Sequence, residues 1–142
     1  MLHVSFAGHP IQAGTLVPHE LTVNPPIIYY PPAGAPLTYL LYDEDKHILH
    51  GFWTGNGTMA AQARLEYWPM QPPSGETHRY TVYVLAESPD SYPDGPLNNG
   101  FSNNGFSNNG FNGEAYRYLD SIGTLIRNFQ LQPLAQLTYF SN

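Results

Sequence analysis

Prolines and glycines divide this chain into short apolar segments, and this division limits the fold more than any other feature. The 142 residues include 14 prolines and 13 glycines, and 14% of the chain is aromatic whereas only 11% is charged. Helix interiors exclude proline, while aromatic and β-branched residues suit strands, so the pattern favours short strands joined by turns over a helical bundle. Residues 1–142 are expected to form a single domain that buries about two-thirds of its unfolded surface.

Apolar runs of strand length predict where the strands lie. The strongest runs are residues 37–42, 48–54 and 79–86. Weaker strand patterns cover residues 2–6, 21–30 (with a kink at Pro25-Pro26), 64–68 and 134–140. Residues 114–129 instead have apolar side chains three or four positions apart, which predicts a helix that tolerates Gly123 and is ended by Pro133. The sequence therefore predicts a mainly β domain with one short helix near its C-terminus.

Charge and cysteine content argue against several classes of protein. The formal net charge is −6 and the chain has only five lysines and arginines, so it lacks the basic patch of a nucleic-acid-binding protein. Without cysteine, a disulfide, a thiolate nucleophile and a cysteine-ligated zinc are impossible. No apolar run approaches the ~18 residues that span a bilayer, and the N-terminus has no signal-peptide pattern. We expect a protein that is not secreted, located in the cytoplasm or in a large intracellular or viral assembly.

Residues 98–113 contain a short tandem repeat, in which Asn-Asn-Gly-Phe recurs every five residues. Its composition is typical of a flexible, low-complexity loop. Asn-Gly also favours tight turns, and a regularly spaced phenylalanine could dock into a groove of a partner. The sequence leaves both interpretations open, and Phe101, Phe106 and Phe111 are the candidate docking residues.

Polar residues occur where three predicted strands begin or end. Residues 72–80 (PPSGETHRY) place histidine, arginine and tyrosine directly before the apolar run of residues 81–85. Residues 40–45 run from an apolar strand into acids, and residues 49–53 place a histidine within a hydrophobic strand. If the sheet brings these segments together, they form a polar pocket at the edge of the core.

With these motifs the chain resembles the phosphatidylethanolamine-binding protein family. That family has Asp-Pro-Asp-x-Pro at a strand end, a Leu-His or His-His step into a hydrophobic strand, and later Pro-Pro-x-Gly-x-x-His-Arg-Tyr. Residues 43–47, 49–53 and 72–80 take these places in the same order. Glu44 and His47 stand where the family has its two prolines, so the rim on that side is expected to differ.

The resemblance implies an antiparallel β-sandwich of Greek-key type, with a short C-terminal helix and a pocket for phosphate or phosphoethanolamine-type head groups. By position, the ligand-binding residues would be Asp43, His50, His78 and Tyr80, with Pro72, Pro73 and Gly75 shaping the rim, and Asp45 and Arg79 forming a structural ion pair behind the site.

The residues themselves allow this chemistry but do not require it. Two imidazoles and a phenol can donate hydrogen bonds to an anion, and an imidazole with a pKa near ~6.5 binds anions better in mild acid. Asp43 would orient an imidazole or receive an ammonium group. The same residues could form a satisfied network without a ligand. A metal site is weaker, because no His-x-His or His-x3-His spacing supports it. Ser74 lacks the Gly-x-Ser-x-Gly context of a nucleophile.

The leading hypothesis is a non-enzymatic binding protein, without cofactor or metal. It would bind a phosphorylated small molecule or a phospholipid head group and act as a regulatory or partner-binding domain. The alternative is a structural or assembly subunit, for example a minor component of a virus particle, that keeps the fold and docks through the repeat loop at residues 98–113. Both hypotheses include a protein partner and neither includes nucleic acid.

Overall fold

The computed structural model describes residues 1–35, 37–55, 67, 69, 72–86 and 121–142, and within these ranges the strands form two sheets. The smaller sheet has the order β2-β1-β4 and consists of β1 (His3–Phe6), β2 (His9–Pro10) and β4 (Ile27–Tyr29). The larger sheet has the order β3-β8-β7-β5-β6 and consists of β3 (Leu16–Val17), β5 (Leu37–Asp43), β6 (Ile48–Gly55), β7 (His78–Ala86) and β8 (Gln132–Ser141).

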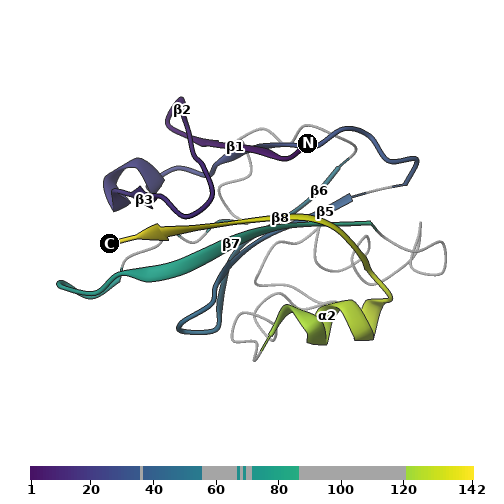
Figure 1. Ribbon diagram of the computed structural model, residues 1–142. Coiled ribbons are helices and arrows are strands. Elements are labelled where there is room, and N and C mark those ends of the chain that lie inside the picture. The colour runs from purple at the N-terminus through teal and green to yellow at the C-terminus, as the bar shows by residue number, and fades with distance from the viewer. Residues whose placement is uncertain (36, 56–66, 68, 70–71, 87–120) are drawn as a thin grey trace.

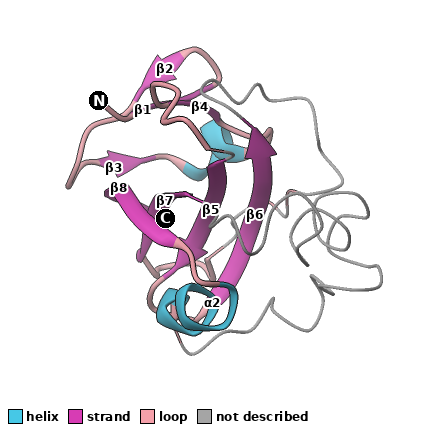
Figure 2. Cartoon of the chain, turned by 90° about the vertical axis from the view of Figure 1, so that its right-hand side faces the viewer, coloured by secondary structure: helices cyan, strands magenta, loops and turns pink. Residues whose placement is uncertain are grey.

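The larger sheet is covered on both faces. The smaller sheet lies over one face, and helix α2 (Ile122–Phe129) lies against the other (Figures 1 and 2). The expected mainly β sandwich with a short C-terminal helix is thus confirmed. Pairing in the described strands is antiparallel except between β3 and β8, which run parallel.

Strand β5 shows how the sequence produces this two-sided burial. Leu37, Tyr39 and Leu41 belong to the core between the sheets, whereas Leu40 and Tyr42 pack with the helix on the opposite face. Because successive strand residues point to opposite faces, a strand covered on both sides is expected to be largely apolar. This explains the apolar run that predicted β5, in which Thr38 and the terminal Asp43 are the polar residues, and every residue of the strand is buried.

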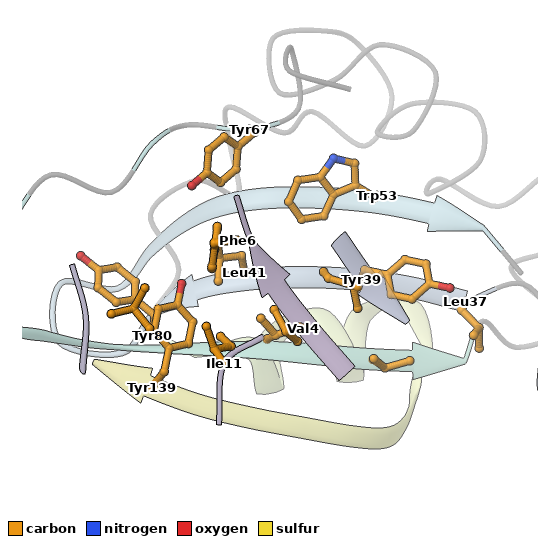
Figure 3. Packing of buried hydrophobic residues seen from close by; sticks show 14 residues of the cluster. Val4, Phe6, Ile11, Leu37, Tyr39, Leu41, Trp53, Tyr67, Tyr80 and Tyr139 are labelled. Carbon is orange, nitrogen blue, oxygen red and sulfur yellow. The ribbon is translucent and has the colours of Figure 1, made fainter. Parts of the chain in front are cut away.

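The core between the sheets is rich in aromatic side chains (Figure 3). Tyr139 stacks on Tyr80 with ring centroids 5.7 Å apart and meets the edge of Phe6 at 5.9 Å. Trp53 stacks on Tyr67 at 6.1 Å, and Figure 3 shows this pair on another side of the same cluster. Offset and edge-to-face pairs of this kind add to the free energy gained by burying the rings.

The helix packs as its apolar spacing predicts, but Pro133 does not end it. Ile122 and Leu125 are buried against the sheet. The helix stops at Phe129 because Gln130 adopts a left-handed conformation (φ 53°) and donates its N–H to the Ile126 carbonyl. Pro133 lies within β8, opposite Leu85 and beside a register shift between Val84 and Leu85, a place where a missing N–H is tolerated.

The expected strand, kink and strand over residues 21–30 is wrong in its first half. A 3-10 helix, η1 (His19–Thr22), replaces the first strand, and only β4 follows the two prolines. Pro18 precedes the turn with φ −58°, and the Thr22 hydroxyl donates to the His19 carbonyl at 2.7 Å, so local bonds stabilise a helical turn here.

Parts of other expected elements lie outside the described residues. These are residues 114–120 of the helix, all of residues 64–68 except Tyr67, and the repeat loop at 98–113 with Phe101, Phe106 and Phe111. Tyr67 itself is buried (7% exposed) and forms an isolated antiparallel bridge with Gly51.

Candidate functional site

Strand register brings the polar residues of β5 and β7 together at one end of the larger sheet. Asp43, the last residue of β5, is paired with Tyr80. His78 lies two positions before Tyr80, so both side chains point to the same face, toward the smaller sheet. Their ring centroids are 6.3 Å apart, and all three side chains are buried.

A β-bulge in β6 brings His50 to the same face. Leu41 pairs with Gly51 and Tyr42 pairs with Leu49, so His50 is an extra residue in the ladder. A bulge changes the direction of a side chain that regular alternation would place elsewhere. His50 meets the edge of the Tyr80 ring, with centroids 5.6 Å apart.

Gly51, beside the bulge, gives room to a tryptophan. A Cβ at this position would lie 2.1 Å from Cη2 of Trp53, closer than any side chain can approach. The indole therefore packs directly over the backbone of residue 51. Glycine at residue 51 is therefore required by the packing of Trp53.

The Asp43 carboxylate is fixed by hydrogen bonds on both oxygens. Oδ1 accepts from the backbone N–H groups of Asp45 (2.8 Å) and Lys46 (3.0 Å), within the turn that leads to β6. Oδ2 lies 2.8 Å from Nδ1 of His78. Of the two roles considered for Asp43, this geometry supports orientation of the imidazole, since an ammonium group would have to compete for occupied oxygens.

The other ring nitrogen of His78 contacts a second acid that the sequence analysis missed. Nε2 lies 2.8 Å from Oε1 of Glu76. Burial lowers the pKa of His78, but the hydrogen bonds with Glu76 and Asp43 outweigh it and raise the pKa above its ordinary value. The bond with His78 likewise lowers the pKa of Glu76. The i, i+2 spacing in an extended chain was the available signal, because it places both side chains on one side.

These side chains surround a pocket of about 250 Å³. The pocket is lined by Asp43, Lys46, Ile48, His50, Pro72, Pro73, His78 and Tyr80. All the sequence-predicted pocket residues are there except Gly75, whereas Ile48 and Lys46, the single lysine of the chain, were not predicted. Burial raises the pKa of Tyr80 well above its ordinary value, with a further contribution from Asp43, so its hydroxyl stays protonated.

Gly75 shapes the neighbouring loop instead. The Glu76 N–H donates to the Pro73 carbonyl at 2.9 Å, and Gly75 at the third position of this turn has φ +86°. That pattern is a type II turn, which needs glycine at this place. The turn borders a more open groove of about 810 Å³, which shares Pro72 and Pro73 with the pocket and is also lined by Glu76.

Asp45 and Arg79 form the expected pair, but on the exposed side of the turn. Arg79 Nε lies 3.6 Å from Asp45 Oδ1, and the Arg79 backbone N–H donates to Asp45 Oδ2 at 2.6 Å. Their side chains are 53% and 38% exposed. An ion pair this exposed contributes little to stability, so the backbone hydrogen bond is its more important part.

The described part of the chain has neither a cluster of metal ligands nor a membrane-spanning helix. No group of three histidine or acidic side chains there is placed to hold a metal ion. Nor does any helix among the described residues have the length and apolar character needed to cross a membrane.

Comparison with solved structures shows which fold this is, although the sequence itself matches no protein-family model and no curated protein. A phosphatidylethanolamine-binding protein from Plasmodium vivax superposes with a TM-score of 0.71 at 12% identity, over 99% of this chain and 84% of that one. A phosphatidylethanolamine-binding protein from Plasmodium falciparum superposes with a TM-score of 0.66 at 16% identity, over 99% of this chain and 84% of that one. A carboxypeptidase Y inhibitor, solved in complex with its cognate proteinase, has a TM-score of 0.66 at 16% identity, over 99% of this chain and 82% of the other.

Proposed function

Because this chain has the fold of the phosphatidylethanolamine-binding proteins, we propose that it is a non-enzymatic binding protein for a phosphate or phosphoethanolamine-type head group. The observation that carries the proposal is the gathering of Lys46, His50, His78 and Tyr80 around a pocket of about 250 Å³. These side chains supply an ammonium, two imidazoles and a phenol, all of them groups that can donate hydrogen bonds to an anion.

The raised pKa of His78 supports an anion as ligand. A histidine whose pKa lies above its ordinary value keeps its positive charge to a higher pH than an ordinary histidine. Asp43 holds Nδ1, so Nε2, which contacts the more exposed Glu76, is the nitrogen that would face the ligand. Lys46 would add a second cation. Binding should therefore strengthen as the pH falls toward mild acid, because protonated His78 attracts the anion.

Calorimetric titration with phosphoethanolamine at about pH 6 tests the proposal. His78→Ala should weaken binding about tenfold or more, because it removes a charge-assisted hydrogen bond worth about 1.5–3 kcal/mol. His9→Ala is the matched control, since His9 is exposed and does not line the pocket. Unchanged affinity in His78→Ala would contradict the proposal.

A protein partner is a further part of the proposal. A carboxypeptidase Y inhibitor of the same fold was solved in complex with its proteinase, so this fold can present a protein-binding surface. The alternative, an assembly subunit that docks through residues 98–113, predicts a different outcome for one variant. Deletion of residues 98–111 should leave phosphoethanolamine binding intact in a ligand-binding domain, whereas an assembly subunit should lose its partner.

A further inference from the structure

We propose that Glu76 is an internal competitor for the anion site: its carboxylate occupies the His78 nitrogen that an incoming anion would use. This inference rests on the function proposed above. Glu76 Oε1 lies 2.8 Å from Nε2 of His78, while Asp43 holds Nδ1 at the same distance. An anion that contacts His78 must therefore displace one of the two carboxylates.

The structure distinguishes the two acids by how firmly they are held. The Asp43 side chain is only 3% exposed and accepts backbone hydrogen bonds from Asp45 and Lys46. The Glu76 side chain is 47% exposed, so it regains water when it leaves the imidazole. Because a buried carboxylate loses more than an exposed one when its partner is removed, Glu76 is the acid that an anion displaces.

Glu76 also has space to move into. It lines the groove of about 810 Å³ that shares Pro72 and Pro73 with the pocket, with His19 and Glu20 along the same groove. The type II turn holds the Glu76 backbone through its N–H to the Pro73 carbonyl, so only the side chain needs to rotate. The carboxylate can thus leave the His78 ring without unfolding β7 or the turn.

Exchange of Glu76 for an anion leaves the number of negative partners of His78 unchanged. The charged or titratable groups around its ring are Asp43 from β5, Lys46 from the β5–β6 turn, His50 from β6 and Glu76 from the preceding turn, and Tyr80 lies beside it. When a bound anion replaces Glu76, His78 keeps two negative partners. Glu76 then sets the affinity of the pocket, since each anion must bind better than the carboxylate it replaces.

The test compares Glu76→Gln and Glu76→Ala with Glu20→Gln in calorimetric titrations with inorganic phosphate and with phosphoethanolamine. Removing the competing charge should tighten binding of both anions about tenfold. Glu20 lines the same groove and is 70% exposed, but it forms its ionic contact with His19, so its variant should bind like the parent. In the absence of ligand, an NMR pH titration should also show a lower pKa for His78 in both Glu76 variants than in the parent.

The outcomes separate this inference from the proposed function. If the parent protein binds phosphoethanolamine and the Glu76 variants bind equally or more weakly, the inference is overturned and the proposed function stands. If neither parent nor variants bind either anion at millimolar concentration, both are overturned. Binding by the Glu76 variants alone would support the inference strongly, because it would show that Glu76 closes the site.

Discussion

Two clusters with the same kinds of side chain lie at one end of the larger sheet, on its opposite faces. The inner cluster, on the face toward the smaller sheet, consists of Asp43, His50, His78 and Tyr80; the outer cluster, at the helix side, consists of Tyr42, Glu44, His47 and Tyr83. Each has an acid, a histidine and a tyrosine, and Asp43 and Glu44 are neighbours in the chain. Members of both clusters bond to one another, but the inner cluster lines the pocket of about 250 Å³ and the outer cluster does not.

The bonding of the outer cluster shows why composition does not identify a site. The Tyr83 hydroxyl donates to Glu44, and the Tyr42 hydroxyl lies 3.0 Å from Nδ1 of His47. Burial raises the pKa of Tyr83, and its hydrogen bond with Glu44 raises it further. Asp43 and Glu44 are adjacent in the chain and point to opposite faces of the sheet. For this reason Asp43 lines the pocket, whereas Glu44 bonds to Tyr83.

The largest difference in stability is expected between variants of the two acids, Asp43 in the inner cluster and Glu44 in the outer cluster. Asp43→Ala should lower the free energy of unfolding by about 3 kcal/mol, because it leaves the buried His78 imidazolium and two part-buried N–H groups without their acceptor. Glu44→Gln should cost about 1 kcal/mol or less. Urea unfolding of both variants measures the difference, and equal losses would show that the two clusters are energetically alike.

Replacing a glycine by alanine should change stability in opposite directions in strand β6 and in helix α2. Gly51→Ala should destabilise by about 1–3 kcal/mol, because its Cβ collides with the Trp53 ring. Gly123→Ala lies in helix α2, where its Cβ meets only the ends of the Ser121 and Arg127 side chains. It should stabilise by about 0.5–1 kcal/mol through helix propensity. Thermal unfolding checks both, and a neutral Gly51→Ala would argue against the packing of the Trp53 ring over residue 51.

The sequence predicted the strands of the larger sheet better than the details of the site. Strands β5 and β7 were predictable because apolar and β-branched residues fill both faces of a doubly covered strand. The meeting of Asp43, His78 and Tyr80 followed from motif order, and their register in the sheet brings them together. That they bind a ligand, and which one, stays a prediction.

The features that the sequence did not reveal depend on local geometry. The bulge at His50 interrupts the alternation of side chains on which strand prediction rests, and no repeating pattern in the sequence marks its position. Glu76 and Lys46 reach the site from turns, where side-chain direction depends on backbone angles such as the φ of Gly75. The 3-10 turn at His19–Thr22 replaced a predicted strand for the same reason, since local hydrogen bonds outweighed a weak apolar pattern.

A smaller effect concerns the pH dependence of stability. The pKa of His78 is raised in the folded state, so its contribution is complete below the unfolded value near ~6.5 and is lost as the pH rises through the higher folded-state pKa. The free energy of unfolding should therefore fall over this window in the parent protein. The fall should shrink in His78→Gln and persist in His47→Gln, its counterpart in the outer cluster. Identical pH profiles for the parent and His78→Gln would contradict the assigned contacts.

The smallest effects are expected from removing single hydroxyl groups, one from each cluster. Tyr83→Phe should cost about 1 kcal/mol of stability by breaking the bond with Glu44, and should leave phosphoethanolamine binding unchanged. Tyr80→Phe should weaken binding by about fivefold, the value of one neutral hydrogen bond, with little loss of stability. Paired urea and calorimetric measurements test this, and the reverse pattern would mean that the outer cluster holds the ligand.

The measurement that tests the central claim most directly is an NMR titration of the parent protein with phosphoethanolamine at about pH 6 and about pH 7.5. We predict saturable shifts at His50, His78 and Tyr80, stronger at the lower pH, while His47 and Tyr83 stay unchanged. An absence of shifts at millimolar ligand would contradict a working anion pocket, and would leave a domain that keeps this fold to bind a protein partner.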